Sequence, residues 1–206
     1  MASGAFFLLY RFFYEQLHVN FWLFRGHFHA IPLFFCKIAC QVKFSEMRTN
    51  EFRIFVYEYD RLDALNPEDQ ELMLAAREAA GEGYAPYSGF FVGAALRLED
   101  GQIIRGNNQE NAAFPSGVCA ERVALYYANA NFSGVSVTSM AVTASNRKGL
   151  VEGPVRPCGS CRQALIETEF RFQKKIRIIL DGKEKIEVFD GVENLLPFAF
   201  RPGSLG

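Results

Sequence analysis

Histidine is scarce in this sequence, and its distribution is uneven. All three histidines, His18, His27 and His29, lie near the amino terminus, and the rest of the chain contains none. A metal or catalytic site in the body of the chain therefore has no imidazole available and must use cysteine and carboxylate side chains.

Cysteine is also sparse. The chain contains five, at uneven spacing: Cys36, Cys40, Cys119, Cys158 and Cys161. An odd count at such spacing is a poor basis for a disulfide framework and indicates a reducing compartment. We therefore expect a cytoplasmic protein that uses cysteine for metal binding or reactivity.

No strong charge of either sign and no long apolar run is present. The net charge is −1 and no basic stripe stands out, which argues against a nucleic acid polymer as partner. The apolar stretches near the amino terminus are interrupted by Arg11, Glu15, Arg25 and Lys37. They fall far short of the ~20 residues that span a bilayer, so no membrane partner is expected.

The first 44 residues differ in composition from the rest of the chain. They hold ten of the 21 phenylalanines, every histidine and the only tryptophan, Trp22. We expect residues 1–46 to form a Phe-rich segment outside the working fold, with Met47 as the true start. Residues 47–206 are long enough for one domain with a substantial core.

From Met47 onward the pattern is that of an α/β protein. Alternation over residues 51–59 predicts a strand, and residues 66–81 read as a helix that Asn66 caps and Gly81 ends. Further helices are expected over 119–131 and 158–170, and further strands over 90–98, 102–106, 137–144 and within 175–189. This order predicts a three-layer α/β/α sandwich with a mixed central sheet of about five strands.

Three cysteines lie at the expected starts of two helices. Cys119 begins one, and Cys158 and Cys161 form a C-x-x-C pair on the first turn of the other. Helix amino termini favour the thiolate, which is the form that binds zinc. Each cysteine alone also fits buried packing or a structural site. Together, three cysteine ligands without histidine leave one place of a tetrahedral zinc for water, as in catalytic sites.

Two charged residues follow the first cysteine directly. Glu121 need not bind the metal and is suited to moving protons beside it. Three thiolates on Zn²⁺ leave a net charge of −1, which a nearby cation would offset. Arg122 and Arg162 are the candidates, and Arg122 is favoured because it adjoins Glu121. The combined pattern C-A-E then P-C-x-x-C is typical of zinc deaminases.

Four ordered segments extend the pattern into a family resemblance. They are "YAPYSGFFVGAAL" (84–96), "GNNQENAAFPSGVCAERVAL" (106–125), "PVRPCGSCRQ" (154–163) and "LLPFAF" (195–200). With them, residues 50–202 resemble the small, homotetrameric, three-cysteine cytidine deaminases. The resemblance implies one Zn²⁺ per chain on Cys119, Cys158 and Cys161, and Glu121 as proton shuttle.

The resemblance also implies a substrate pocket. Asn108 and Glu110 match residues that hold the sugar hydroxyls. Phe90 matches an aromatic that packs on the pyrimidine, and the Ala120 N–H matches a contact to the pyrimidine carbonyl. Phe114 and Phe200 match aromatics that line the pocket, one of them from a neighbouring subunit. Arg122 and Gln163 are expected just outside the ligands. Gly89 stands where the family often has a basic residue. Phe114 stands where the family often has tyrosine, so a hydroxyl contact is lost and the fine substrate preference is expected to differ from that of the family.

The implied reaction is zinc-dependent hydrolytic deamination of free cytidine or deoxycytidine to uridine or deoxyuridine, with release of ammonia, as in pyrimidine salvage. One alternative is a related deaminase of nucleoside antibiotics. Another is a non-enzymatic zinc-binding module whose fourth ligand is Cys36, Cys40 or an amino-terminal histidine. A homotetramer and a small nucleoside substrate are the expected partners.

Overall fold

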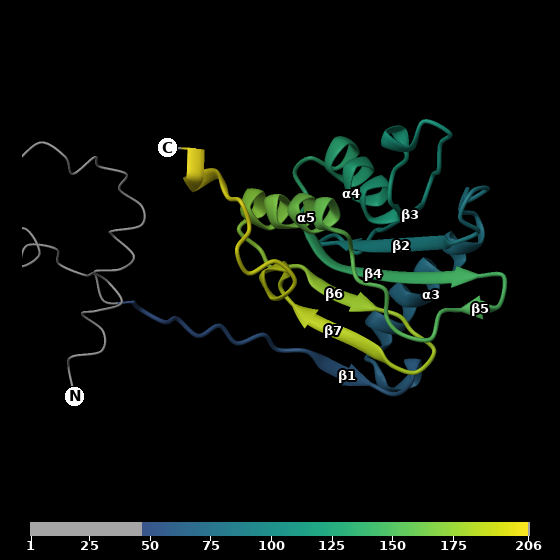
Figure 1. Ribbon diagram of the computed structural model, residues 1–206, viewed down its shortest axis with the longest axis horizontal. Helices are drawn as coiled ribbons and strands as arrows, with labels where there is room; N and C mark the ends of the chain where they lie inside the picture. The colour runs from purple at the N-terminus through teal and green to yellow at the C-terminus, as the bar shows by residue number, and fades with distance from the viewer. Residues whose placement is uncertain (1–46, 206) are drawn as a thin grey trace, which may run out of the picture. The chain divides into compact units, whose positions relative to one another are not determined.

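The computed structural model describes residues 47–205 (Figure 1). The chain divides between Glu51 and Phe52 into two units, and the elements described below belong to the second. The expectations for residues 1–46, including a metal ligand at Cys36, Cys40 or a histidine, lie outside the described residues. None of the described helices is long and apolar enough to cross a membrane.

A mixed sheet forms the centre of the second unit. Its strands are β1 (Tyr57–Tyr59), β2 (Phe91–Leu98), β3 (Ile103–Asn107), β4 (Val137–Asn146), β5 (Gly149–Leu150), β6 (Arg177–Leu180) and β7 (Ile186–Asp190). They follow the order β1-β7-β6-β4-β2-β3, and β5 pairs with β4. Strands β4 and β6 are parallel, and the other pairs are antiparallel.

The sheet has seven strands rather than the five or so expected. Two of the seven strands are short, because β1 and β5 contain three and two residues. The strand predicted over residues 51–59 is largely wrong, since only Tyr57–Tyr59 pairs with β7. The alternating pattern continues towards the amino terminus, but exposed side chains such as Phe52 and Phe55 show that no buried face accompanies it.

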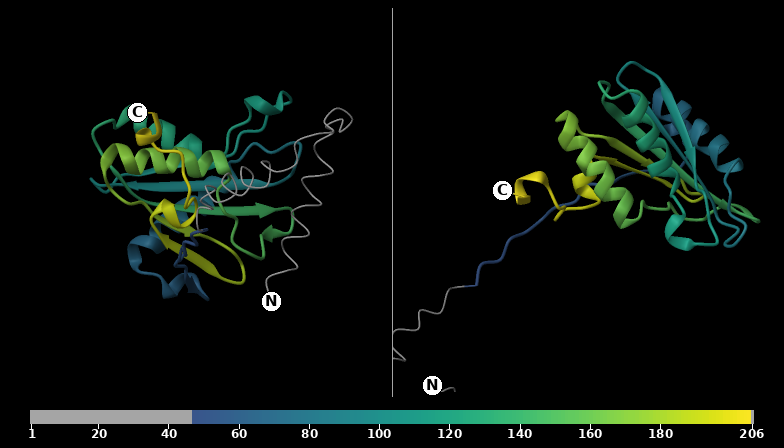
Figure 2. Two further views of the ribbon diagram at one scale, coloured as in Figure 1. Left: turned by 60° about the vertical axis from the view of Figure 1, so that its left-hand side comes forward. Right: turned by 90° about the horizontal axis from the view of Figure 1, so that it is seen from above.

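Helices cover both faces of the sheet, so the predicted three-layer sandwich is confirmed. They are α3 (Pro67–Gly81), α4 (Ala120–Asn131) and α5 (Gly159–Phe172), with short 3-10 helices at Leu62–Ala64, Phe114–Ser116, Val192–Asn194 and Pro202–Leu205. Strand residues alternate between the layers. Ala95, Ala141 and Ile179 pack in the α3 core. Ala94, Met140 and Ile178 pack with α4 and α5 on the other face. Figure 2 shows α3 on one face of the sheet and α4 and α5 on the other.

Two glycines allow the strands and helices to approach closely. A Cβ at Gly93 of β2 would lie 2.0 Å from the Ala76 carbonyl oxygen of α3. A Cβ at Gly106 of β3 would lie 2.7 Å from the Ala120 carbonyl oxygen and 2.6 Å from the Ala124 nitrogen of α4. Only a residue without a side chain fits such contacts. Gly106 thus fixes where the first turn of α4 lies against the sheet.

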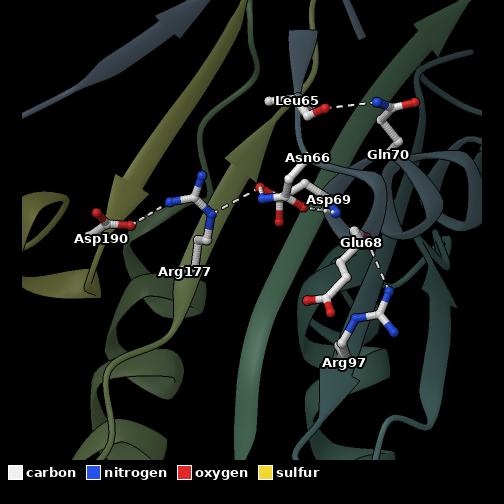
Figure 3. A network of polar contacts seen from close by, with 8 residues as sticks. All are labelled: Leu65, Asn66, Glu68, Asp69, Gln70, Arg97, Arg177 and Asp190. Carbon is white, nitrogen blue, oxygen red and sulfur yellow. Dashed lines mark hydrogen bonds and ion pairs between the residues drawn. The ribbon is translucent and has the colours of Figure 1, made fainter. Parts of the chain in front are cut away.

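The start of α3 is held to the sheet by polar contacts (Figure 3). As predicted, Asn66 caps the helix, and its Oδ1 accepts a hydrogen bond from the Asp69 N–H at 2.8 Å. The guanidinium of Arg177 on β6 bridges Asp69 at 3.0 Å and Asp190 of β7 at 2.6 Å. Arg97 of β2 donates to the Glu68 carbonyl oxygen at 3.0 Å.

Further along α3, a buried carboxylate joins the helix to two strands. Asp181, which follows β6, has a fully buried side chain. It accepts hydrogen bonds from Arg77 of α3 at 2.7 and 2.8 Å and from the Thr143 hydroxyl of β4 at 2.7 Å. The charge of Asp181 is thus compensated within the layer.

Candidate metal centre

Two helix starts bring the three cysteines of the body together. Cys119 is the N-cap residue of α4, Cys158 is the N-cap residue of α5, and Cys161 lies on the first turn of α5. The Cys119 and Cys158 Sγ atoms are 3.9 Å apart, and those of Cys158 and Cys161 are 3.5 Å apart. All three sulfurs lie within 4.8 Å of one another.

The spacing of the sulfurs fits zinc ligation. Tetrahedral Zn–S bonds of ~2.3 Å place neighbouring sulfurs about 3.8 Å apart, whereas a disulfide needs ~2.05 Å. The three thiols are free, and Cys158 is exposed while Cys161 is buried. Among the described residues, no fourth histidine, cysteine or carboxylate joins the cluster. The donor set therefore suits one Zn²⁺ with an open side.

A cation lies beside the cluster. The Arg122 Nη2 atom is 3.8 Å from the Cys119 Sγ, and its buried Nε has no acceptor among the described residues. Contact with the Cys161 thiol and with the Arg122 guanidinium lowers the pKa of Cys119 to about 5. The contact with Cys119, together with burial, raises the pKa of Cys161. The cluster therefore favours a thiolate at Cys119.

The second candidate cation, Arg162, has another task. Its Nε donates to the Pro157 carbonyl oxygen at 2.7 Å, and its Nη1 donates to the Leu195 carbonyl oxygen at 2.9 Å. It fastens the turn before Cys158 to the carboxy-terminal segment. The preference for Arg122 as the cation at the sulfurs is consistent with this arrangement.

Glu121 lies on the first turn of α4 and is 5% exposed. Burial raises the pKa of its carboxyl group, and the adjacent Cys119 adds to the effect. The carboxyl also contacts the Cys161 thiol, and it forms no ion pair with any residue in the described part of the chain. A buried carboxyl beside the sulfurs, with a raised pKa, is suited to accept and return a proton.

The two residues expected at the sugar hydroxyls lie on one loop after β3. The Asn108 Oδ1 accepts from the Val92 N–H at 2.8 Å, and its Nδ2 donates to the Phe90 carbonyl oxygen at 2.8 Å. Glu110 accepts from the Tyr87 N–H at 2.9 Å and from the Ser88 hydroxyl at 2.5 Å. These contacts tie the loop to the segment that carries Phe90, so the structure brings Asn108, Glu110 and Phe90 together.

The other predicted pocket residues are more widely spread. Ala120 is the fully buried first residue of α4. Phe114 is 75% exposed, with its ring centroid 6.0 Å from that of Tyr87. Phe200 lines a separate hollow with Ile166 and Phe170 of α5. The Gln163 Nε2 holds the Phe200 carbonyl oxygen at 2.8 Å, so Gln163 acts on the carboxy-terminal segment rather than at the sulfurs.

Sequence reasoning missed several residues that support the site. Ser88, which donates a hydrogen bond to Glu110, lies within the segment 84–96 that carries the resemblance, but nothing in its sequence context indicated this contact. The ion pair of Arg156 with Glu187 was also missed. Its members are 31 residues apart, and no local pattern links them.

Known proteins resemble this chain across the same region. A family model for the cytidine and deoxycytidylate deaminase zinc-binding region matches residues 66–175, which include Glu121 and the three clustered cysteines. A cytidine deaminase of Halalkalibacterium halodurans is 43% identical over 100 residues, covering 48% of this chain and 71% of the relative. One from Sporosarcina psychrophila is 44% identical over 99 residues, covering 48% and 68%.

A solved structure is similar as well. The crystal structure of a cytidine deaminase from Burkholderia pseudomallei superposes with a TM-score of 0.54 at 37% identity. The similarity covers 63% of this chain and 97% of that one. The fold and the zinc-binding region therefore agree with the same group of proteins.

Proposed function

Because this chain belongs to the cytidine and deoxycytidylate deaminase family, we propose that it converts free cytidine or deoxycytidine and water to uridine or deoxyuridine and ammonia. The observation that carries the proposal is the cluster of three sulfurs at two helix starts, with the buried Glu121 beside it. This arrangement combines a zinc-binding donor set with a proton carrier.

Each residue at the cluster has a part in the mechanism. Cys119, Cys158 and Cys161 would hold the zinc, which when bound supplies the Lewis acidity that activates water near neutral pH. Glu121 takes a proton from the attacking water and delivers it to ring nitrogen N3, which makes carbon C4 electrophilic. It then carries the second proton to the amino group, and ammonia leaves. Arg122 offsets the negative charge of the thiolates.

The substrate is held by the loop after β3 and the start of β2. Asn108 and Glu110 bind the sugar hydroxyls, and Phe90 packs on the pyrimidine. Their common support is the set of hydrogen bonds that joins Asn108 to the backbone at Phe90. The first N–H groups of α4 are free of helical partners, so the Ala120 N–H binds the pyrimidine carbonyl, and Phe114 lines the pocket.

The working assembly is a homotetramer in which Phe200 completes the pocket of a neighbouring subunit. The 56% exposure of Phe200 supports this, as does its position away from the sulfurs. Sedimentation at assay concentration checks the assembly. Phe200→Ala chains mixed with Glu121→Gln chains should regain activity if the aromatic acts across subunits. Independent sites would gain nothing on mixing.

The catalytic unit comprises residues 47–206, and it works in cytoplasmic pyrimidine salvage. The family match to residues 66–175 supports a catalytic unit in this part of the chain. Removing residues 1–46 should leave zinc content and turnover unchanged. A truncated protein that loses its zinc would point instead to a fourth ligand in the amino-terminal segment and to a non-enzymatic zinc module.

Ammonia release is the direct test of the reaction. The purified chain is incubated with cytidine, deoxycytidine, deoxycytidylate and a cytosine nucleoside antibiotic at equal concentrations. We expect rapid release from the two free nucleosides, loss of activity with a zinc chelator, and recovery when zinc is restored. Release from the antibiotic alone would reject the proposed substrate class, and release from none would reject the enzyme.

A further inference from the structure

The loop from β5 to α5 delivers Cys158, the most exposed of the three sulfur ligands. Its first half is fixed by backbone contacts with the turn between β6 and β7. The Lys183 N–H donates to the Val151 carbonyl oxygen at 2.9 Å, and the Glu184 N–H donates to that of Glu152 at 3.0 Å. These contacts hold the start of the loop but not the part that adjoins Cys158.

The second half of the loop is held by a charged side chain. The Arg156 Nη2 atom lies 2.7 and 2.6 Å from the two carboxylate oxygens of Glu187 on β7. Arg156 is two residues before Cys158, and Arg162 holds the intervening Pro157 through its carbonyl oxygen at 2.7 Å. These two arginine contacts therefore hold the chain immediately before Cys158.

Glu187 occupies an unusual position for a carboxylate. Its neighbours Ile186 and Val188 face the α3 core, whereas Phe189 faces the core of α4 and α5. By strand alternation, Glu187 points towards the metal side of the sheet. Its side chain is only 2% exposed, although Arg156 is 49% exposed. A buried carboxylate is strongly unfavourable without a cation, so Glu187 draws Arg156 down onto the sheet.

A second cation contributes less to Glu187. The Lys185 Nζ lies 3.2 Å from one carboxylate oxygen and also pairs with Glu58 of β1. It belongs to β7's own turn and therefore holds no part of the cysteine loop. Arg156 is the partner that couples the buried charge to the ligand.

We propose that the Arg156–Glu187 ion pair positions Cys158 for metal binding. This inference rests on the proposed function only in requiring that the three cysteines hold zinc. Arg156 and Glu187 act through the backbone of the loop and touch neither the substrate nor the metal. They restrict where the Cys158 Sγ can lie relative to the Cys119 sulfur at the start of α4.

The test is the rate at which the zinc-loaded protein gives up its metal to a colorimetric chelator. Contacts that orient ligands typically change metal affinity by about 10- to 100-fold. Arg156→Met and Glu187→Gln should each release zinc at least about tenfold faster than the wild type. Arg156→Lys retains one cation and should recover part of the loss. Cobalt-substituted protein should show altered ligand-field bands in Arg156→Met.

The opposite face of the sheet provides a matched control. Arg77 is 37% exposed and pairs with the fully buried Asp181, so it reproduces the chemistry with an arginine that lies on α3 and not on the cysteine loop. Arg77→Met should lower the melting temperature as Arg156→Met does, with zinc release unchanged. Lys183→Met removes an exposed ion pair with Glu152 on the same loop and should also leave release unchanged.

Two results would overturn the proposal: zinc release at the wild-type rate in both Arg156→Met and Glu187→Gln, or equal acceleration in Arg77→Met. If Arg156→Met does not fold, Glu187→Gln and Arg156→Lys carry the same comparison. Because release is measured without nucleoside, a wild-type protein that holds zinc but fails to deaminate cytidine rejects the proposed function and leaves this inference standing.

Discussion

Two buried carboxylates on opposite faces of one sheet have different charged neighbours. Asp181, on the α3 face, is fully buried and is met by the Arg77 guanidinium and the Thr143 hydroxyl. Glu121, on the α4 face, is 5% exposed and lies beside thiols, and no cation in the described part of the chain pairs with it.

The difference separates architecture from chemistry. A buried carboxylate whose charge is met by a guanidinium and a hydroxyl ties elements of the fold together. A buried carboxylate without an ion pair lowers the stability of the fold, and burial raises the pKa of Glu121, as suits a group that exchanges protons. The α3 face therefore serves the fold, and the α4 face carries a group whose environment suits proton transfer.

The largest expected effect comes from exchanging each carboxyl for an amide. Glu121→Gln should keep one zinc per chain and lower kcat by about 10³-fold, because the amide cannot carry protons. Asp181→Asn should keep zinc and kcat but lower the free energy of unfolding by about 2 kcal/mol, because Arg77 loses its charged partner. Turnover assays, zinc analysis and denaturant unfolding are applied to both variants.

An active Glu121→Gln protein would reject the proton-shuttle assignment. A large loss of turnover per bound zinc in Asp181→Asn would show that the α3 face is not merely architectural. Either result would remove the contrast between the two faces.

The next effect uses the two glycines at which helices meet the sheet. Gly93→Ala meets the backbone of α3 and should lower the free energy of unfolding by about 3 kcal/mol, with zinc affinity retained. Gly106→Ala meets Ala120 and Ala124 and should lower it by about 2 kcal/mol, and should also weaken zinc binding because α4 carries Cys119. Unfolding curves and chelator competition report the two quantities separately. Equal zinc affinity in both variants would contradict the link between Gly106 and the site.

A smaller effect is expected from the cation at the sulfurs. Arg122→Gln should bind zinc about tenfold more weakly and slow turnover, because the Cys119 thiolate loses its charged neighbour at 3.8 Å. Arg122→Lys is the matched control, since it keeps the charge. Unchanged zinc affinity and kinetics in Arg122→Gln would show that the helix termini alone suffice.

The smallest effect is the pH dependence of stability. Burial raises the pKa of Glu121, so its contribution to stability is complete below the unfolded-state pKa and is lost as pH rises through the folded-state pKa. As the pH rises between these two pKa values, the free energy of unfolding of Glu121→Gln should therefore increase relative to that of the wild type, by at most ~1.4 kcal/mol per pH unit. Denaturant unfolding at matched zinc loading measures the difference. A constant difference across pH would mean that Glu121 is not perturbed.

Much of the fold could be predicted because its signals are local. Asn66 and Pro67 mark the start of α3, and the apolar periods of the strands and helices give the layers. The cysteines and Glu121 could be identified because their chemistry and spacing are specific even without a structure.

What could not be predicted depends on contacts between distant segments. Arg156 and Glu187 meet only after the sheet forms, and each looks like an ordinary surface charge in the sequence. The alternation before Tyr57 resembles a strand, but pairing with β7 begins only at Tyr57, opposite Val188. Phe200 could be identified as an aromatic near the end of the chain, but its distance from the sulfurs depends on the course of the segment after α5.

The sulfur ligands come from segments 39 residues apart along the chain. A zinc ion held by both would act as a cross-link that closes this long loop, and such closure removes entropy from the unfolded chain much as a disulfide does. Metal-free protein should consequently unfold at a lower denaturant concentration than the zinc-loaded protein.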